Sequence, residues 1–237
     1  MKKIILILTA LCLVLSFGCA SAEENTAAET AEAKTVNVGD VVIFGTYEQD
    51  NVTDNGAEPI EWTVLDVQDG EALLLTKYAI DSINYHPGHR EKEFPTWARS
   101  FVRGWLNGDF MNAAFTAEEQ AAIKTKLLTN PTYKQNAGGK HTEDKVFFLA
   151  RHELEQYMTT YESRMCLPTE YAVAQGAWVS SKYTIDGKPC TWWWLRTPGY
   201  YRSCASSVRT RGTITSNRVY DNSGAVRPAI WVDVNAL

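Results

Sequence analysis

The sequence predicts an α+β fold built from short antiparallel sheets with a few helices and long loops. Residues 60–68 (IEWTVLDVQ) alternate apolar and polar side chains, as half-buried strands do. Asp69 and Gly70 form a two-residue turn signal, and residues 71–78 return as the second arm of a hairpin. Helix signals lie between such strands, but no strand–helix–strand unit repeats along the chain. Without that repeat, antiparallel sheets are favoured over parallel ones.

The chain begins with the pattern of an export signal. Lys2 and Lys3 form a positive N-terminal region, residues 4–17 are an apolar run, and small residues follow. Residues 1–22 are therefore predicted to be an export signal. The domain that follows is expected to work outside the cytoplasm, secreted or lipid-anchored at a bacterial surface.

Two ways of processing this signal compete. Residues 20–22 (ASA) fit the small-x-small pattern for cleavage after Ala22. A preceding Gly-Cys pair instead fits a lipobox, which would leave a lipidated Cys19 as the link to a membrane. Residues 23–35 have no large apolar side chain and are predicted to be a disordered tether. The folded domain is predicted to span residues 36–237.

A helix is predicted to start at Thr96. Trp97, Phe101 and Trp105 recur every four residues, which predicts an apolar stripe packed against the core. Gly108 is predicted to end this helix.

A second helix is predicted from a capping box. Thr116 and Glu119 have the spacing at which each side chain caps the other residue's backbone, and the helix is expected to run to about Leu128. The other predicted elements are a first strand at 36–47, a buried strand at 145–150, helices at 151–158 and 168–175, and a short strand that begins at Trp178.

Composition limits the classes of function. The formal net charge is −5 and no basic run is present, which argues against nucleic acid as a partner. Eight tryptophans and eleven tyrosines favour an aromatic core or an aromatic binding surface.

Chemistry-bearing residues are sparse. Beyond the export signal three cysteines remain, Cys166, Cys190 and Cys204, so at most one disulfide forms within the chain, for example Cys190 with Cys204. His86 and His89 would bind metal only if other ligands converged on them, so neither a metal site nor a cofactor is predicted. No catalytic constellation is found, and the domain is not predicted to be an enzyme.

A polar segment near the C-terminus has an unusual composition. Residues 199–223 lie between two apolar blocks, at 191–198 and 225–234, that read as buried strands. The segment is therefore expected to be a surface loop. It contains four Arg and three Tyr but no Lys, Glu, Gln, Met or Trp. Codons that end in a pyrimidine never encode those five types, so diversification of such codons would explain the gap; an accidental gap in a Ser/Thr/Asn-rich loop is the alternative.

The flanking motifs suggest a family. WWWLRTPG at 192–199 and AVRPAIWV at 225–232, with Ala225 in place of a more usual Gly, resemble an uncharacterised bacterial domain family found mostly in exported proteins. That family is similar to C-type-lectin-like folds of the formylglycine-generating-enzyme type. Members of this fold serve as variable proteins of diversity-generating retroelements, which randomise adenines in a C-terminal segment. The resemblance implies a diversified ligand-binding face on a fixed scaffold.

This resemblance divides the C-terminal region into variable and fixed positions. The variable, ligand-binding positions are expected to project together from one face, and they are Tyr200, Tyr201, Arg202, Ser203, Ser207, Arg209, Thr210, Arg211, Thr213, Thr215, Ser216, Asn217, Arg218, Tyr220, Asp221 and Asn222. The structural frame is expected to include Trp193, Trp194, Arg196, Gly199, Gly212, Arg227 and Trp231. Arg196 and Arg227 are expected to pair with acids or carbonyls beneath the site.

Two other functions remain open at this stage. One is a lectin-like module of fixed specificity for a carbohydrate or a cell-wall ligand. The other is an enzyme on the formylglycine-generating scaffold, although the copper-binding cysteine pair of that enzyme is not evident. In the preferred hypothesis, the ligand is a protein or glycan outside the cell.

Overall fold

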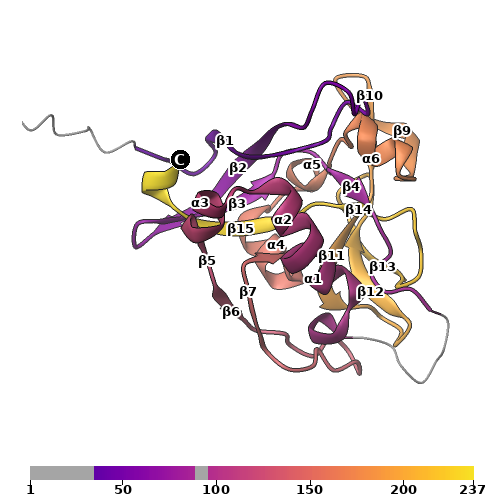
Figure 1. Ribbon diagram of the computed structural model, residues 1–237. Coiled ribbons are helices and arrows are strands. Elements are labelled where there is room, and N and C mark those ends of the chain that lie inside the picture. The colour runs from indigo at the N-terminus through magenta and orange to yellow at the C-terminus, as the bar shows by residue number, and fades with distance from the viewer. Residues whose placement is uncertain (1–34, 89–95) are drawn as a thin grey trace, which may run out of the picture. The chain divides into compact units, whose positions relative to one another are not determined.

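The computed structural model describes residues 35–88 and 96–237, and these form an α+β domain with mostly antiparallel sheets. The larger sheet has the strand order β1-β2-β3-β15-β5, and β8 also pairs with β15. Its strands are β1 (Val41–Tyr47), β2 (Glu58–Gln68), β3 (Glu71–Thr76), β5 (Ile123–Lys124), β8 (Val146–Phe147) and β15 (Ala229–Asp233). The C-terminal strand thus lies beside strands from the start of the domain (Figure 1).

The second sheet contains the first C-terminal motif and the start of the second, which continues into β15 of the larger sheet. Its strand order is β13-β12-β11-β14-β4, in which only the β11–β14 pair is parallel. Its strands are β4 (Asp81–Ser82), β11 (Trp193–Pro198), β12 (Cys204–Val208), β13 (Ile214–Arg218) and β14 (Ala225–Val226). Two small two-stranded sheets pair β6 (Lys126–Leu128) with β7 (Thr142–Asp144), and β9 (Val179–Ile185) with β10 (Lys188–Thr191).

The predicted hairpin of residues 60–78 is confirmed as β2 and β3. Asp69 and Gly70 both have positive φ, 52° and 76°, as the turn requires. Ile60, Trp62 and Val64 point into the core and are at most 1 % exposed, while the residues between them are half-buried. The alternation in the sequence therefore determined which face of β2 is buried.

The helix predicted after Thr96 forms, and Trp97 and Trp105 of its predicted stripe pack in or against the core, but Phe101 and the end of the helix were wrongly predicted. Helical structure consists of the 3-10 turn η2 (Trp97–Arg99), α1 (Phe101–Trp105), the π turn η3 (Leu106–Phe110) and α2 (Met111–Ala114). The chain remains helical through Gly108, where no neighbouring group comes close to the missing side chain.

Ser100 explains the shift of the stripe. Its side chain accepts a hydrogen bond from the backbone N–H of Arg103, so Ser100 is the N-cap and α1 starts at Phe101 rather than at Thr96. The buried positions become Val102, Leu106 and Phe110, and Phe101 is 45 % exposed. Trp97 is fully buried, but from the preceding 3-10 turn.

The second predicted helix is also shorter than expected. The capping box of Thr116 and Glu119 is present and opens α3 (Ala117–Ala122). Ile123 then turns extended, with its side chain 1 % exposed, and pairs with Val232 of β15. Ile123 is β-branched and favours a strand, and it pairs with β15. This tertiary pairing ends the helix well before Leu128.

The remaining predictions hold in part. The helices are α4 (Arg151–Tyr157), α5 (Tyr161–Arg164), α6 (Glu170–Ala174) and the terminal 3-10 turn η4 (Val234–Ala236). Predicted strands at 36–47 and 145–150 shorten to β1 and β8. The short strand predicted to begin at Trp178 appears as β9, one residue later. Its hairpin with β10 was not predicted, although Asp186 and Gly187 at the turn have positive φ, 50° and 77°, and are a recognisable turn pair.

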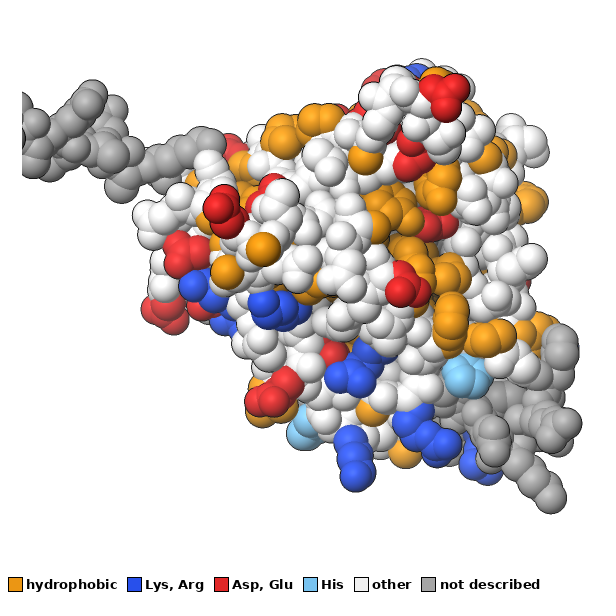
Figure 2. Space-filling view, in the orientation of Figure 1, with side chains coloured by type: hydrophobic (Ala, Val, Ile, Leu, Met, Phe, Trp, Pro, Cys, Tyr) orange, Lys and Arg blue, Asp and Glu red, His pale blue; other side chains and the backbone are white. Residues whose placement is uncertain are grey.

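An aromatic cluster extends from the core toward the surface between β1 and the helices. Tyr47 packs edge-on against Phe110 and Tyr171, and Trp105 packs against Phe110. Figure 2 shows hydrophobic side chains gathered right of centre on the viewed face, and Lys and Arg mainly in its lower half. Many of the aromatic residues therefore build this domain rather than a ligand site.

The predicted export signal and nearly all of the predicted tether lie outside the described residues. Cleavage after Ala22 and lipidation of Cys19 thus stay predictions. Within residues 35–88 and 96–237, no helix has the length and the apolar character needed to cross a membrane.

Candidate functional site

The two motif segments meet in the second sheet, where β11 of the first motif pairs with β14, the start of the second motif; the second motif then continues into β15 of the larger sheet. Trp193 of β11 is paired with Ala225 of β14 on one side and with Val208 of β12 on the other. The segment between the motifs is not the loop that the sequence predicted. It forms the hairpin β12–β13, and five consecutive residue pairs, from Cys204 with Arg218 to Val208 with Ile214, join its arms. Strand β13 is the outer edge of the sheet.

The residues expected to form the frame are all buried. They are Trp193, Trp194, Arg196, Gly199, Gly212, Arg227 and Trp231, each at most 8 % exposed or classed as buried. The indole N–H of Trp193 donates to the carbonyl of Arg164 at 3.0 Å, and that of Trp194 donates to the carbonyl of Ile83 at 3.1 Å. These bonds satisfy the polar atom of each buried indole.

Two glycines allow the backbone of the hairpin to pack closely. Gly212 has φ +82°, and a Cβ there would come within 1.8 Å of the carbonyl oxygen of Tyr161. A Cβ on Gly199 would come within 2.5 Å of the Cβ of Cys204. Both ends of β12 are therefore fixed by contacts that only glycine permits.

Arg196 joins the second sheet to helix α4. Its guanidinium forms a forked ion pair with Glu153 and donates to the carbonyl of Phe148 at 2.9 Å. Glu153 in turn accepts the backbone N–H of Ala150 and so caps α4. Nε of Arg196 is buried without a partner among the described residues.

Arg227 is a buried cation without a carboxylate partner in the described part of the chain. Its Nε donates to the carbonyl of Thr76 at 2.9 Å, and its guanidinium lies 4.9 Å from the ring centre of Trp193. Burial lowers its pKa, and the nearby Cys166 opposes that shift. A carbonyl and an aromatic face thus compensate this charge in place of an acid.

Most of the predicted ligand-binding positions reach the surface. Those classed as exposed are Tyr200, Tyr201, Arg202, Arg209, Arg211, Arg218 and Asn222. Those that are half-buried are Ser203, Thr213, Thr215, Ser216, Asn217, Tyr220 and Asp221. Ser207 and Thr210 are buried, at 0 % and 7 % exposed, and offer little surface to a ligand.

The expectation that these positions share one face is wrong. Successive side chains of a strand point to opposite faces, so Thr215 and Asn217 lie with Ser207, while Ser216 and Arg218 lie on the other face. Asn217 accepts the hydroxyl of Ser207 at 2.9 Å, which confirms their shared face. Because β13 is an edge strand, both of its faces remain at least partly accessible.

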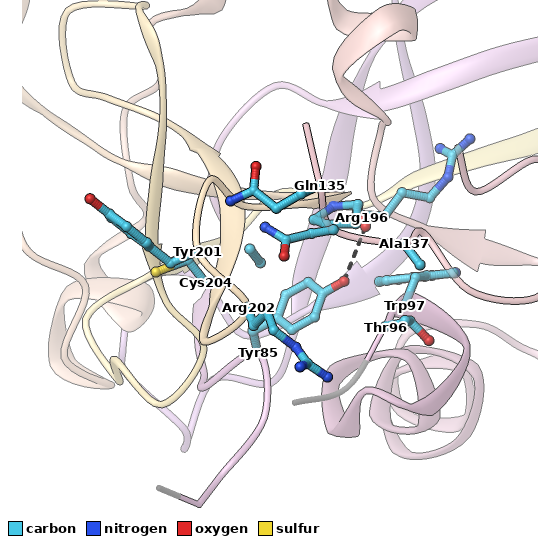
Figure 3. Close-up of a pocket in the computed structure, with 12 residues that line it drawn as sticks. Tyr85, Thr96, Trp97, Gln135, Ala137, Arg196, Tyr201, Arg202 and Cys204 are labelled. Atoms are coloured by element: carbon cyan, nitrogen blue, oxygen red, sulfur yellow. Dashed lines mark hydrogen bonds between the residues drawn. The ribbon is translucent and has the colours of Figure 1, made fainter. Parts of the chain in front are cut away.

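One hollow, which we call the Tyr201 hollow, lies where the start of the hairpin meets the body of the domain. Its volume is about 460 Å³, and Tyr201, Arg202 and Cys204 line it together with Tyr85 and Trp97. Figure 3 shows the guanidinium of Arg202 across the hollow from the amide of Gln135. One wall of this hollow thus contains positions predicted to be variable, and another contains aromatic residues from outside the variable segment.

The fixed side of this hollow is rigidly held. The Tyr85 hydroxyl donates to the carbonyl of Arg196 at 3.2 Å (Figure 3), and burial raises the pKa of this phenol. Asn136 donates from its amide to the carbonyls of Gly199 and Tyr200 at 2.9 and 2.8 Å. These bonds hold the path of the chain just before Tyr201.

A second hollow, the Trp178 hollow, lies along the far part of the hairpin. Its volume is about 430 Å³, and Arg209, Thr215 and Asn217 line it together with Trp178 and Trp192. Trp178 is 53 % exposed, whereas Trp192 is 7 % exposed. Trp178 was not among the predicted site residues, because nothing in the sequence around it shows that it lies against a segment 31 to 39 residues further on.

The three cysteines of the domain are free thiols, so the suggested Cys190–Cys204 disulfide is not present. Burial raises the pKa of the Cys166 thiol, and it raises that of Cys190 to about 11, with Cys166 adding to the rise. Both thiols are therefore protonated at neutral pH and weakly nucleophilic. Cys204 is half-buried at the Tyr201 hollow.

A group of carboxylates lies outside the hairpin. Glu48, Asp50 and Glu58 have oxygen atoms within 4.8 Å of one another. Backbone N–H groups of Gln49 and Val52 bind these oxygens, which accounts for the grouping without an ion. His89 of the His86–His89 pair lies outside the described residues.

Fold and site together define a class: an α+β domain of curled antiparallel sheets that carries a polar hairpin on the edge of one sheet. The chain belongs to the family described as domain of unknown function (DUF6273), whose model matches residues 69–234. The match covers both motif segments and the whole hairpin. A search of curated proteins gave no match, and neither did a search of solved structures.

Proposed function

We propose that this protein is an exported or surface-anchored ligand-binding protein that displays a diversified C-terminal hairpin, like the variable proteins of diversity-generating retroelements. One observation carries the proposal: residues 199–223 form a hairpin whose second strand, β13, is the outer edge of a sheet, and the inner strands β11 and β14 of that sheet come from the two buried motif segments. Substitutions on that edge leave the core packing intact. All predicted variable positions except Ser207 and Thr210 lie at least partly at the surface.

The finer fold class belongs to this proposal. A C-type-lectin-like fold of the formylglycine-generating-enzyme type rests on the resemblance of the two motifs. Their direct pairing through Trp193 and Ala225 supports it, because it brings the start of the second motif beside the first motif, next to the hairpin. The ligand is a protein or a glycan outside the cell, and a lipid on Cys19 would link the protein to a membrane.

The DNA around the gene tests the proposal directly. A diversified gene should have a nearby partial copy of its 3′ end that differs from the coding copy only at adenines, together with a reverse transcriptase gene. The differences should fall in the codons of the surface positions of the hairpin. If neither the copy nor the reverse transcriptase gene is present, the hairpin is an ordinary surface element.

A protein experiment tests the physical division. Randomising the accessible positions of the hairpin should leave most variants folded, whereas randomising Trp193, Trp194 or Arg227 should unfold nearly all of them. Protease resistance of the displayed domain is the readout. Ser207 and Thr210 should behave as frame positions, and equal tolerance at frame and surface positions would refute the division.

A lectin-like module of fixed specificity is the second candidate. The observation that favours it is the exposed Trp178, which lies outside the variable segment. Sibling proteins, which differ from this one only in the variable segment, would all share it. Proteins that differ only in the hairpin would then bind the same ligand. Different specificities among such siblings would favour the diversified protein.

A further inference from the structure

The hairpin carries positive charges that have no acidic partner among the described residues. Residues 199–223 contain four arginines in a chain of net charge −5, and within the described residues none of the four forms an ion pair. Three are held instead by hydroxyls of the same hairpin: Arg209 donates to Thr215 at 3.1 Å, Arg211 to Thr213 at 3.0 Å, and Arg218 to the hydroxyl of Tyr220. A hydroxyl orients a guanidinium but leaves its charge uncompensated, so these groups are prepared for an anion.

Only one of these arginines lies beside an exposed indole. Arg209 lines the Trp178 hollow, where the half-exposed ring of Trp178 offers an apolar surface. Asn217 lies there as well. Its Oδ1 is occupied by the hydroxyl of Ser207, while its Nδ2 has no partner among the described residues. Thr215 adds a hydroxyl.

These groups match one ligand chemistry. A pyranose ring has an apolar C–H face that stacks on an aromatic ring, and hydroxyls at its edge that need hydrogen-bond partners. An acidic protein would also satisfy the arginines, but it has no need for a flat indole in a hollow of about 430 Å³. The combination therefore favours a sugar that carries a carboxylate.

Building on the proposed function, we propose that the Trp178 hollow binds a carboxylate-bearing sugar unit of an anionic glycan. The ring stacks on Trp178, its carboxylate is bound by Arg209, and its hydroxyls are bound by Asn217 and Thr215. Trp178 lies outside the variable segment, whereas the three polar residues lie within it. Siblings would thus keep the stacking surface and change the polar contacts.

Calorimetric titration of the full chain with a hexamer of galacturonic acid tests this proposal. The fully methyl-esterified hexamer has the same rings without the charge, and it should bind at least about tenfold more weakly. Trp178→Ala and Arg209→Gln should each weaken binding of the acidic hexamer by about tenfold or more. Phe101→Ala and Arg151→Gln, an exposed aromatic and a surface arginine outside both hollows, should change it by less than about threefold.

Several results would overturn the proposal: no binding of the acidic hexamer, equal binding of the ester, or binding that Trp178→Ala leaves unchanged. Binding of poly-glutamate that depends on Arg209 but not on Trp178 would show an acidic-protein site instead. The two proposals fail separately. A partial gene copy that differs only at adenines, found together with no sugar binding, would refute only the glycan site. Sugar binding without such a copy would refute only the diversification.

Discussion

At the scale of single residues, this domain contains buried ionisable side chains whose charges are compensated by neighbouring groups to different degrees. Arg196 is 1 % exposed and has a forked carboxylate partner, whereas Arg227 is 4 % exposed and has a carbonyl and an indole face. Asp81 is 8 % exposed, and its donors among the described residues are neutral: the Tyr47 hydroxyl at 2.7 Å and the backbone N–H of Ser82 at 2.6 Å. Each arrangement makes a different prediction.

Arg196→Met should lower the free energy of unfolding by about 3 kcal/mol or more, because it leaves Glu153 without the partner that a largely buried carboxylate needs. Arg151→Met is the matched control. It breaks the exposed pair with Glu155 in the same helix and should cost less than about 1 kcal/mol. Urea unfolding measures both, and similar losses would show that Arg196 is not a structural clamp.

The pH dependence of stability should have opposite signs at two aspartates. Burial raises the pKa of Asp81, so the folded state binds this proton more tightly, and wild type should gain stability relative to Asp81→Asn as the pH falls from neutral toward 3.8. The hydrogen bond from Lys124 lowers the pKa of Asp233, so wild type should lose stability relative to Asp233→Asn as the pH falls below 3.8.

Urea unfolding of the three proteins between about pH 7 and pH 3 measures these differences. Each aspartate variant serves as the control for the other, since the remaining carboxyls are common to both. If the two variants differ from wild type with the same sign of slope, burial does not control the charge of Asp81.

At the scale of elements, the β12–β13 hairpin depends on how its turn is seated. Residues 209–213 form that turn, and Gly212 lies against the backbone of Tyr161 at the start of α5. The turn of β9–β10 provides a comparison, because Gly187 has a similar φ of +77° but no atom within 4 Å of the position where a Cβ would lie. Only one of these turns is packed against the domain.

Gly187→Ala should cost about 1–2 kcal/mol, the strain of a left-handed residue with a Cβ. Gly212→Ala should cost clearly more, because the turn must also move away from Tyr161. Hydrogen exchange should show the additional loss of protection in β12 and β13. Equal costs, or unchanged protection of these strands, would mean that the turn is free to shift.

At the scale of the whole domain, the C-terminal strand joins parts that are distant in the sequence. β15 pairs with β3, β5 and β8, while β14 just before it pairs with β11 and β4. Removal of residues 225–237 should therefore abolish cooperative unfolding. Removal of residues 1–34 should leave the melting temperature unchanged, and thermal melts followed by circular dichroism check both. A stable fold without residues 225–237 would contradict this account of the sheet.

Local signals predicted the local structure well. The Asp69-Gly70 turn, the capping box of Thr116 and Glu119, and helix α4 all appear as expected. Errors arose where a distant partner decided the outcome. Ile123 left its helix to pair with β15, and the polar 199–223 segment became two strands because β11 offered an open edge. Neither partner could be recognised from nearby residues.

For the candidate site, composition and flanking motifs indicated the segment but not its geometry. The sequence by itself determined that residues 199–223 are polar, rich in Arg and Tyr, and enclosed by apolar strands, because burial of those strands forces the material between them outward. Only the tertiary structure decided that this segment is an edge hairpin with two accessible faces, and that Trp178 stands against it. Strand register and contacts between distant segments depend on the packing of the whole chain, which no local pattern encodes.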